Sequence, residues 1–231
     1  MEKTKKGDFV EIEFVGKVKN TDTIFDTNIK GEAKKINLKL EEKPLIICIG
    51  EEMLVQGFDK ALEEKEIGKK YSVLLQPTEA FGERKRELVK TIPLNIFHEK
   101  NIDPQPGMML TLDNFLAKII SVSGGRVLTD LNNPLSGKEI EYEFKIKEKV
   151  SDEKKKVNGL QDFFFRQRFK FEIKDKNIVF EEKAEPFLKI FGDKFKELLG
   201  EDLITEKKQE VKKEKERLKE EKPKLKEEGK K

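Results

Sequence analysis

One stretch constrains the fold more than any other: residues 47–64, ICIGEEMLVQGFDKALEE. A short apolar run leads into a glycine and then into a segment whose apolar side chains share one helical face: Leu54, Val55, Phe58 and Leu62. The spacing predicts a helix over residues 53–64, which is too short to be stable without packing. Gly57 lies inside this helix, where glycine costs roughly 1 kcal/mol relative to alanine. The glycine therefore needs a reason beyond helix formation.

Two segments far apart in the chain alternate apolar and polar residues, as half-buried strands do. Residues 8–18 place Val10, Ile12 and Phe14 on one face, and residues 139–150 alternate in the same way at Ile140, Tyr142, Phe144 and Ile146. Shorter apolar runs at 41–50 and 71–77 predict two further strands. Residues 20–28, NTDTIFDTN, are expected to form a turn.

A small β-rich module is predicted to interrupt this first domain. Residues 107–112, 117–122 and 126–131 read as strands, the SGG sequence at 123–125 as a hairpin turn, and the region around Pro93 as an apolar turn. We therefore expect a first domain at 1–85 and 133–150, with an inserted domain at 86–132. Insertion at a loop is tolerated because lengthening a loop adds little closure entropy.

The last part, residues 151–231, is predicted to be an α+β domain with a charged helical tail. We expect a linker at 151–156, a helix, a β-hairpin around 175–177, an amphipathic helix within 184–203 and a Lys/Glu-rich helix from about 206. The aromatic run at 162–171, DFFFRQRFKF, exceeds what short elements easily bury. Its Phe163–Phe165 cluster suggests a homodimer contact, with a second client surface or plain core as alternatives.

Composition narrows the classes of function. Lys+Arg (49) nearly balance Asp+Glu (46), so the net charge of +3 argues against a dedicated nucleic-acid binder. Cys48 is the only cysteine and His98 the only histidine, which favours neither a metal site nor a His-based triad. We expect no cofactor. The absence of a signal-like or membrane-spanning apolar run predicts a cytoplasmic protein.

Four motifs in order carry a resemblance: IFDTN at 24–28, KPLIICIGEEMLVQGFDKAL at 43–62, TEAFG at 78–82 and a late EYEF at 141–144. Together they resemble FKBP-type peptidyl-prolyl cis-trans isomerases. The insert resembles the insert-in-flap domain of the SlyD-like branch, and the length is similar to the long archaeal type. The resemblance implies an α+β fold in which a twisted antiparallel sheet curls around a short helix. In that fold, Gly57 would let a second backbone segment pass close to the helix.

The resemblance also implies an apolar cleft that binds proline. The residues at catalytic positions are Asp26, Phe81 and Tyr142, and those at substrate-binding positions are Phe14, Phe25, Leu45, Ile47, Leu54, Val55 and Phe58. Phe58 stands where tryptophan is common in the family, and Phe81 where tyrosine is common. Without the resemblance, the same apolar residues would be interpreted as ordinary core.

Isomerisation of an X-Pro bond breaks no covalent bond and needs no nucleophile, so an apolar cleft with one carboxylate is chemically sufficient. The resemblance further assigns the insert to binding unfolded or nascent polypeptides, through Ile92, Leu94, Ile96, Phe97, Met108, Met109, Leu110 and Phe115. A small core filled with methionine is the alternative interpretation of these residues. A holdase chaperone with little isomerase activity is the alternative function of the whole chain.

Overall fold

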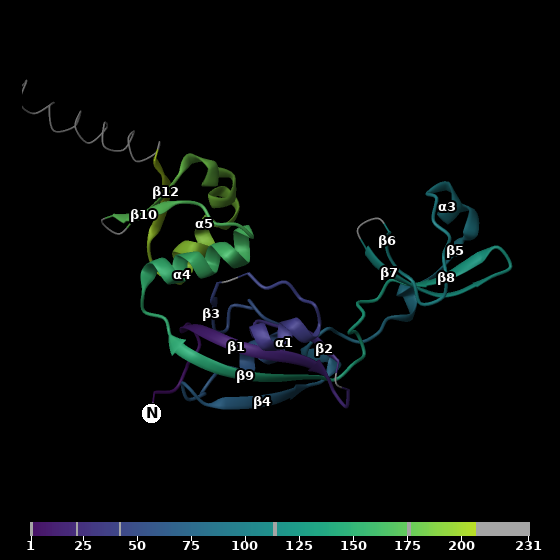
Figure 1. Ribbon diagram of the computed structural model, residues 1–231. Helices are drawn as coiled ribbons and strands as arrows, with labels where there is room; N and C mark the ends of the chain where they lie inside the picture. The colour runs from purple at the N-terminus through teal and green to yellow at the C-terminus, as the bar shows by residue number, and fades with distance from the viewer. Residues whose placement is uncertain (1, 22, 42, 113–114, 175–176, 207–231) are drawn as a thin grey trace, which may run out of the picture.

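The computed structural model describes residues 2–21, 23–41, 43–112, 115–174 and 177–206. The chain forms three parts: a sheet domain, an inserted domain reached through two connecting segments, and a C-terminal domain (Figure 1). The charged helix predicted from about residue 206, with pairs such as Glu210→Lys213, lies outside the described residues from residue 207 onward.

The first domain is a five-stranded antiparallel sheet, which confirms the predicted α+β class. Its strands follow the order β2 (Ile24–Thr27), β1 (Phe9–Val18), β9 (Ile140–Lys149) and β4 (Lys70–Leu75), and β3 (Leu45–Cys48) also pairs with β1. The alternating segments at the two ends of the domain form its central pair, with Phe14 opposite Phe144. Because β9 follows the insert in sequence, the domain is complete only when the chain returns from it.

The helices of this domain are shorter than the sequence suggested. Helix α2 spans Gln56–Ala61, with Phe58 and Asp59 buried, and residues 51–54 form turns instead of the first helical turn. A second helix, α1 (Lys30–Lys35), occupies a polar stretch for which none was predicted, and residues 24–27 form strand β2 instead of a turn. A 3₁₀ turn, η1 (Pro77–Glu79), follows β4.

The insert is a four-stranded antiparallel sheet with its own small core. Strands β5 (Val89–Pro93), β8 (Arg126–Asp130), β7 (Phe115–Ser123) and β6 (Met109–Leu112) lie side by side in that order, with α3 (Leu94–Glu99) after β5. The predicted hairpin at Gly124–Gly125 joins β7 to β8 and is confirmed. The region around Pro93 is a strand followed by a helix, not the expected turn, and a 3₁₀ turn, η2 (Arg86–Leu88), precedes it.

The two segments that connect the insert to the first domain are joined by hydrogen bonds. The side chain of Asn132 accepts from the Lys85 N–H (2.9 Å) and donates to the Lys85 carbonyl (3.0 Å). Asp130 accepts from Asn132 and also from Arg84, whose guanidinium forms a salt bridge with it (2.6 Å). These contacts hold the outgoing and returning segments together at the base of the insert.

The C-terminal domain begins with helix α4 (Glu153–Leu160), so the prediction of a linker at 151–156 was wrong. Asp152 caps this helix by accepting from the Lys155 N–H (2.7 Å), which explains why a lysine-rich sequence starts a helix here. A π-turn, η3 (Gln161–Phe165), continues it. The predicted hairpin is β10 (Phe171–Lys174) with β11 (Asn177–Phe180), and η4 (Glu182–Ala184), α5 (Glu185–Leu199) and β12 (Asp202–Thr205) complete the domain.

The C-terminal domain packs onto the first domain through a shared hydrophobic core. Helix α4 lies against β3 so closely that a Cβ on Gly159 would come within 2.9 Å of the Ile46 carbonyl oxygen. Phe165 is buried and stacks on Phe195 of α5 (ring centroids 4.9 Å apart). The aromatic run that suggested a homodimer contact is thus mostly internal, because α5 folds over it and supplies the packing partners.

Candidate active site

The loop before α2 is held by a buried carboxylate. Asp59 accepts hydrogen bonds from the backbone N–H groups of Gly50 (2.9 Å) and Glu52 (3.0 Å). Burial raises the pKa of Asp59, and the two hydrogen bonds oppose that rise. The loop is thereby fixed in the shape that presents Leu54 and Val55, both half-buried, at the surface of the domain.

Gly57 allows the close approach that the resemblance implied. A Cβ at this position would lie 3.0 Å from the Glu79 carbonyl oxygen and 2.7 Å from the Leu75 side chain. The 3₁₀ turn after β4 therefore passes directly over α2, and it leads straight into Phe81. This contact explains why the helix contains a glycine despite its cost in helix propensity.

An aromatic layer lies beneath the predicted cleft. The rings of Phe58 and Tyr142 stack with centroids 4.2 Å apart and an interplanar angle of 9°. Phe14 packs against both rings, at 5.6 Å and 5.9 Å. Phe58 is only 1% exposed and Tyr142 only 4%, so these two predicted contact residues are covered in this structure. Their mutual stacking and the ring of Phe14, which packs on both, account for this covering.

A second aromatic pair, Phe25 and Phe81, is half-buried beside this layer. Phe25 meets Phe81 edge to face at 5.6 Å and meets Tyr142 edge to face at 5.8 Å. Gly16 on β1 makes this possible, because a Cβ there would lie 2.7 Å from the Phe25 ring and 2.9 Å from the Tyr142 ring. Strand β2 is fixed to β1 by Asn28, whose Oδ1 accepts from the Phe14 N–H (2.8 Å) and whose Nδ2 donates to the Ile12 carbonyl (2.7 Å).

A cavity of about 510 Å³ opens beside these aromatic rings. Five predicted site residues line it: Phe14, Asp26, Leu45, Ile47 and Leu54. The other five predicted residues, Phe25, Val55, Phe58, Phe81 and Tyr142, lie outside its lining. Its volume falls within the usual range for small-ligand sites. Residues of the C-terminal domain form part of its wall: Gly159, Asp162, Phe163 and Arg166.

Asp26 supplies a carboxylate at the edge of an apolar surface. Partial burial raises the pKa of Asp26 above its ordinary value of 3.8, although the backbone N–H of Thr27 works in the opposite direction. Burial also raises the pKa of Tyr142, and the negative charge of Asp26 raises it further. Tyr142 therefore keeps its proton at neutral pH, and Asp26 is the charged group of this pair.

The remaining reactive side chains carry no catalytic arrangement. Cys48 is buried, and its burial together with the nearby charges of Glu51 and Asp59 raises the pKa of the thiol to about 12. It is therefore protonated and a weak nucleophile. His98 is exposed at the end of α3 in the insert. Within the part of the chain that the structure describes, no group of three His, Cys, Asp or Glu residues is placed to hold a metal ion.

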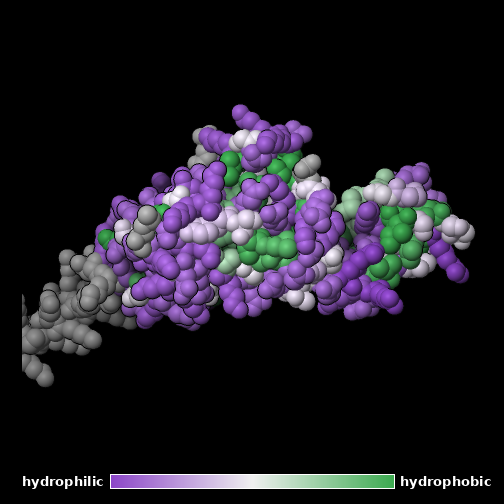
Figure 2. Space-filling view, turned by 90° about the horizontal axis from the view of Figure 1, so that it is seen from below, coloured by the Kyte–Doolittle hydropathy of each residue, from purple (hydrophilic) through white to green (hydrophobic). Residues whose placement is uncertain are grey.

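The insert presents some of its predicted client-binding residues and buries others. Ile96, Met108, Met109 and Phe115 are exposed, with Phe115 at 62%. Phe97 is 1% exposed and, with Ile119 and Val127, forms the core against which Ile92, Leu94 and Leu110 pack. Phe97 therefore belongs to the core, because α3 folds back onto the sheet. Leu116 and Ile120 are exposed as well, although they were not predicted. Figure 2 shows apolar surface on the insert, the right-hand lobe of that view.

Among the described residues, no helix has both the length and the hydrophobicity needed to cross a membrane.

Comparisons with known proteins agree with this architecture. A profile of the FKBP-type peptidyl-prolyl cis-trans isomerase family matches residues 1–97, and a profile described as FKBP26, IF domain, matches residues 90–135. A short-type peptidyl-prolyl cis-trans isomerase of Methanocaldococcus jannaschii is 31% identical over 147 residues, which cover 62% of this chain and 92% of that protein. The isomerase SlyD of Helicobacter pylori is 27% identical over 127 residues, covering 53% of this chain and 68% of that protein.

The chain therefore belongs to the FKBP-type peptidyl-prolyl cis-trans isomerase family, and it is an isomerase of peptide bonds that precede proline. Within the family it is similar to proteins of the SlyD group, including that of Haemophilus influenzae, which is 32% identical over 105 residues covering 43% of this chain and 54% of that protein. The match to an IF domain falls on the four-stranded insert between Val89 and Asp130.

Proposed function

We propose that the half-buried surface made by Phe25, Leu54, Val55 and Phe81, with Asp26 at its edge, binds the proline ring and the preceding residue of a polypeptide. The observation that carries this proposal is the cavity that Asp26 and Leu54 line. Phe25, Val55 and Phe81 lie outside its lining, and we assign them to the site because of the resemblance to the family. Phe58 and Tyr142 are assigned to its support, because stacking keeps them covered.

The proposed chemistry is rotation about the X-Pro bond without covalent catalysis. The barrier of ~18–20 kcal/mol arises from lost amide resonance. The planar amide is more dipolar than the twisted one, so an apolar surface that excludes water disfavours the ground state relative to the transition state. Lowering the barrier by ~4 kcal/mol would accelerate rotation about a thousandfold.

Three groups are given roles in this rotation. The ring edges of Phe25 and Phe81, which meet edge to face, offer weakly positive C–H groups to the carbonyl before proline. Asp26 provides a fixed negative charge close to the twisting amide. The backbone N–H of Val55, at the start of α2, anchors a substrate carbonyl. Phe81 lacks the hydroxyl that tyrosine would carry, so one hydrogen bond to the substrate is missing.

We infer that the insert binds unfolded or nascent polypeptides and passes them to the cleft. The exposed side chains Met108, Met109, Phe115, Leu116 and Ile120 support this inference, since methionine-rich surfaces adapt to varied partners. Met109 and Ile120 also line a groove of about 630 Å³ at the base of the insert. A client held there would experience a raised effective concentration at the cleft.

A double surface variant and a matched control test whether the insert and the cleft have separate roles. Changing both Met109 and Phe115 to serine should weaken suppression of aggregation and slow a proline-limited refolding reaction, while kcat/KM for a tetrapeptide stays unchanged. Ile190→Ser is the matched control, because Ile190 is 72% exposed but lies on α5. Equal effects of the double variant on tetrapeptide and protein substrates would refute a separate client site.

The holdase alternative makes a different prediction for the same assays. A chain that suppresses aggregation but does not accelerate rotation in a tetrapeptide would be a chaperone with a non-functional cleft. We also propose a cytoplasmic location, a place among the long archaeal members of the family, and a homodimer formed through the C-terminal domain. The predicted contact at Phe163–Phe165 is mostly packed against α5, and a monomeric mass at high concentration would exclude the dimer.

A further inference from the structure

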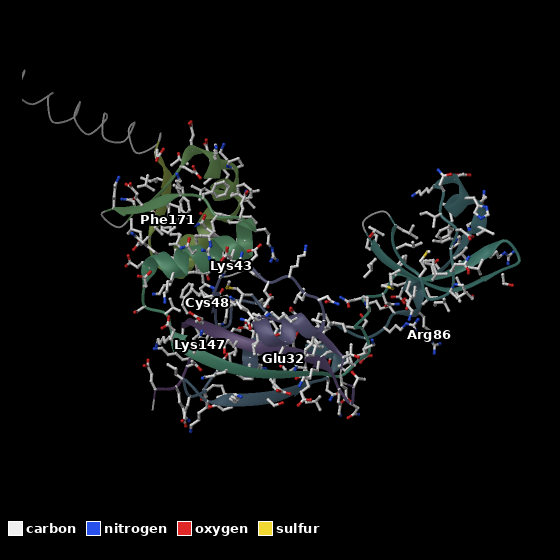
Figure 3. All side chains as sticks on the ribbon, viewed as in Figure 1. Glu32, Lys43, Cys48, Arg86, Lys147 and Phe171 are labelled. Carbon is white, nitrogen blue, oxygen red and sulfur yellow. The ribbon has the colours of Figure 1, made fainter. Side chains whose placement is uncertain are left out.

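The cleft is not made by the isomerase domain alone. Its cavity is walled on one side by Leu45 and Pro44, and on another by Phe163 and Arg166 of the C-terminal domain. Figure 3 shows Lys43 at the junction of the two domains, where its ammonium group binds the Asp162 carboxylate (3.1 Å). A second ion pair, between Lys194 and Glu51 (2.6 Å), joins the domains elsewhere.

The π-turn after α4 determines which aromatic residue reaches the cavity. It sends Phe165 into the core and Phe164 against α5, and leaves Phe163 half-buried in the cavity wall. Arg166 ends the turn in the left-handed conformation (φ 56°), which brings its guanidinium to 5.5 Å from the centre of the Phe163 ring.

The charges around Arg166 leave its guanidinium available. Asp162 is occupied by Arg168 through two hydrogen bonds (3.0 Å and 2.6 Å) and by Lys43. Among the residues that the structure describes, no carboxylate forms an ion pair with Arg166. Asp26 and Glu41 also line the cavity, and Glu41 pairs with Lys43. At Arg166, the cavity wall combines an apolar ring with an exposed cation that the described carboxylates leave unpaired, and this combination is complementary to a carboxylate carried on a peptide.

We propose that Phe163 and Arg166 form an additional substrate subsite, which selects polypeptides with Asp or Glu close to the proline. This proposal rests on the assignment of the cleft to the X-Pro bond, and it deepens that assignment by naming a sequence preference. Arg166 is a specificity-determining residue in this account. It does not touch the rotating bond, and rotation itself does not require it.

The test uses the full-length chain and a set of hexapeptides with one proline. Each peptide carries Glu, Gln or Lys at one position, from two residues before the proline to two residues after it, and exchange NMR gives kcat/KM without a coupling protease. At low salt we expect Glu to be favoured over Lys by about three- to fivefold at one or more positions, as for an exposed ion pair. The preference should shrink at high salt.

The matched variants are Arg166→Gln and Arg86→Gln, which remove the same charge. Arg86 lies at the base of the insert, away from the junction with the C-terminal domain (Figure 3). Arg166→Gln should abolish the preference for Glu over Lys peptides, and Arg86→Gln should keep that preference. No preference in the original chain, or a preference that survives Arg166→Gln, would overturn the proposal.

Peptide binding tests the subsite even if the protein does not accelerate isomerisation of these peptides. The same peptides can be titrated into isotope-labelled protein while the backbone amides of residues 159–166 are followed. Larger shifts with Glu than with Lys peptides, lost in Arg166→Gln, would support the subsite even in a chain that does not isomerise the peptides. Equal shifts with both peptides would contradict it, whereas failure of turnover alone would contradict only the assignment of the cleft.

Discussion

Gly159 offers a direct test of how the C-terminal domain sits on the isomerase sheet. Substitution by alanine would place a Cβ 2.9 Å from the Cβ and carbonyl oxygen of Ile46, well inside normal contact distance. Ile46 lies in β3, where it pairs with Glu11 of β1, so it cannot move without disturbing the sheet. We expect the overlap to cost about 1–3 kcal/mol, the usual range for overpacking.

Gly192 provides the matched control because it is also helical, in α5, and a Cβ there meets nothing within 4 Å. Alanine gains about 1 kcal/mol of helix propensity at either position. Gly192→Ala should therefore stabilise the protein by about 1 kcal/mol. The gain in helix propensity is the same in both variants, so the difference between their free energies of unfolding gives the cost of the overlap at Gly159.

Thermal unfolding followed by circular dichroism measures this difference. For a chain of this size, 1 kcal/mol corresponds to roughly 2–4 °C in Tm, so Gly159→Ala should melt several degrees below Gly192→Ala. Hydrogen exchange should show the loss first at the amides of α4. If the two variants were equally stable, α4 would not lie against β3, and the cavity wall made by the C-terminal domain would have to be abandoned.

Three further predictions concern the cleft. Gly16→Ala should lower the free energy of unfolding by about 1–3 kcal/mol and also lower kcat/KM, because its Cβ would lie 2.7 Å from the Phe25 ring. Gly31→Ala is the control and should leave kcat/KM unchanged, because a Cβ there meets nothing within 4 Å. Equal activities of the two variants would contradict the proposed packing. Because the pKa of Asp26 is raised, the carboxylate loses its charge, as pH falls, at a higher pH than an ordinary aspartate does, and activity should decline from a pH above 3.8. Asp26→Asn should be less active and should show no such decline. A pH profile shared by both proteins would remove Asp26 from the mechanism. Phe81→Tyr should raise kcat/KM by about fivefold if its hydroxyl gains one hydrogen bond of ~1 kcal/mol to the substrate, and an unchanged value would show that no such bond forms.

Much of the fold could be predicted because its strands carry simple periodic patterns. The alternation predicted both β1 and β9 as strands of one domain, although not that they pair across more than a hundred residues, and the hairpin of β10 and β11 was equally clear. Helix α1 gave no such signal because only Ala33 of its six residues is buried. Helix α4 was missed at its start because its first turns are lysine-rich and depend on the cap at Asp152.

The aromatic run at 163–165 shows what periodicity cannot reveal. The three consecutive phenylalanines have different environments, because the π-helix departs from the regular α-helical spacing. Phe165 lies in the core, Phe164 packs against α5, and Phe163 lies in the cavity wall. An expectation based on local composition counted all three as surplus apolar surface. The partners of Phe164 and Phe165 come from α5, and their partner Phe195 is some thirty residues later in the chain, whereas Phe163 contacts Phe164 and Arg166.

Some features of the candidate site could be predicted from the sequence, and others could not. The motifs around Asp26, Leu54 and Phe81 could be found from their order in the chain. The roles of Gly16 and Asp59 could not, since each depends on a contact between elements that only the folded chain brings together. The covering of Phe58 by Tyr142 likewise follows from the pairing of β9 with its neighbours and leaves no local signal.

In the proposed mechanism, a largely apolar surface that excludes water lowers the rotational barrier of an X-Pro bond. Exchange NMR on a short proline peptide measures this directly, with the full-length chain and with Leu54→Asn, a change at a half-buried position that brings polarity and water to the cleft. We expect clear acceleration over buffer by the original chain and a loss of about tenfold or more, ~1.4 kcal/mol, in a folded variant. Exchange no faster than in buffer, or a fully active Leu54→Asn protein, would contradict it.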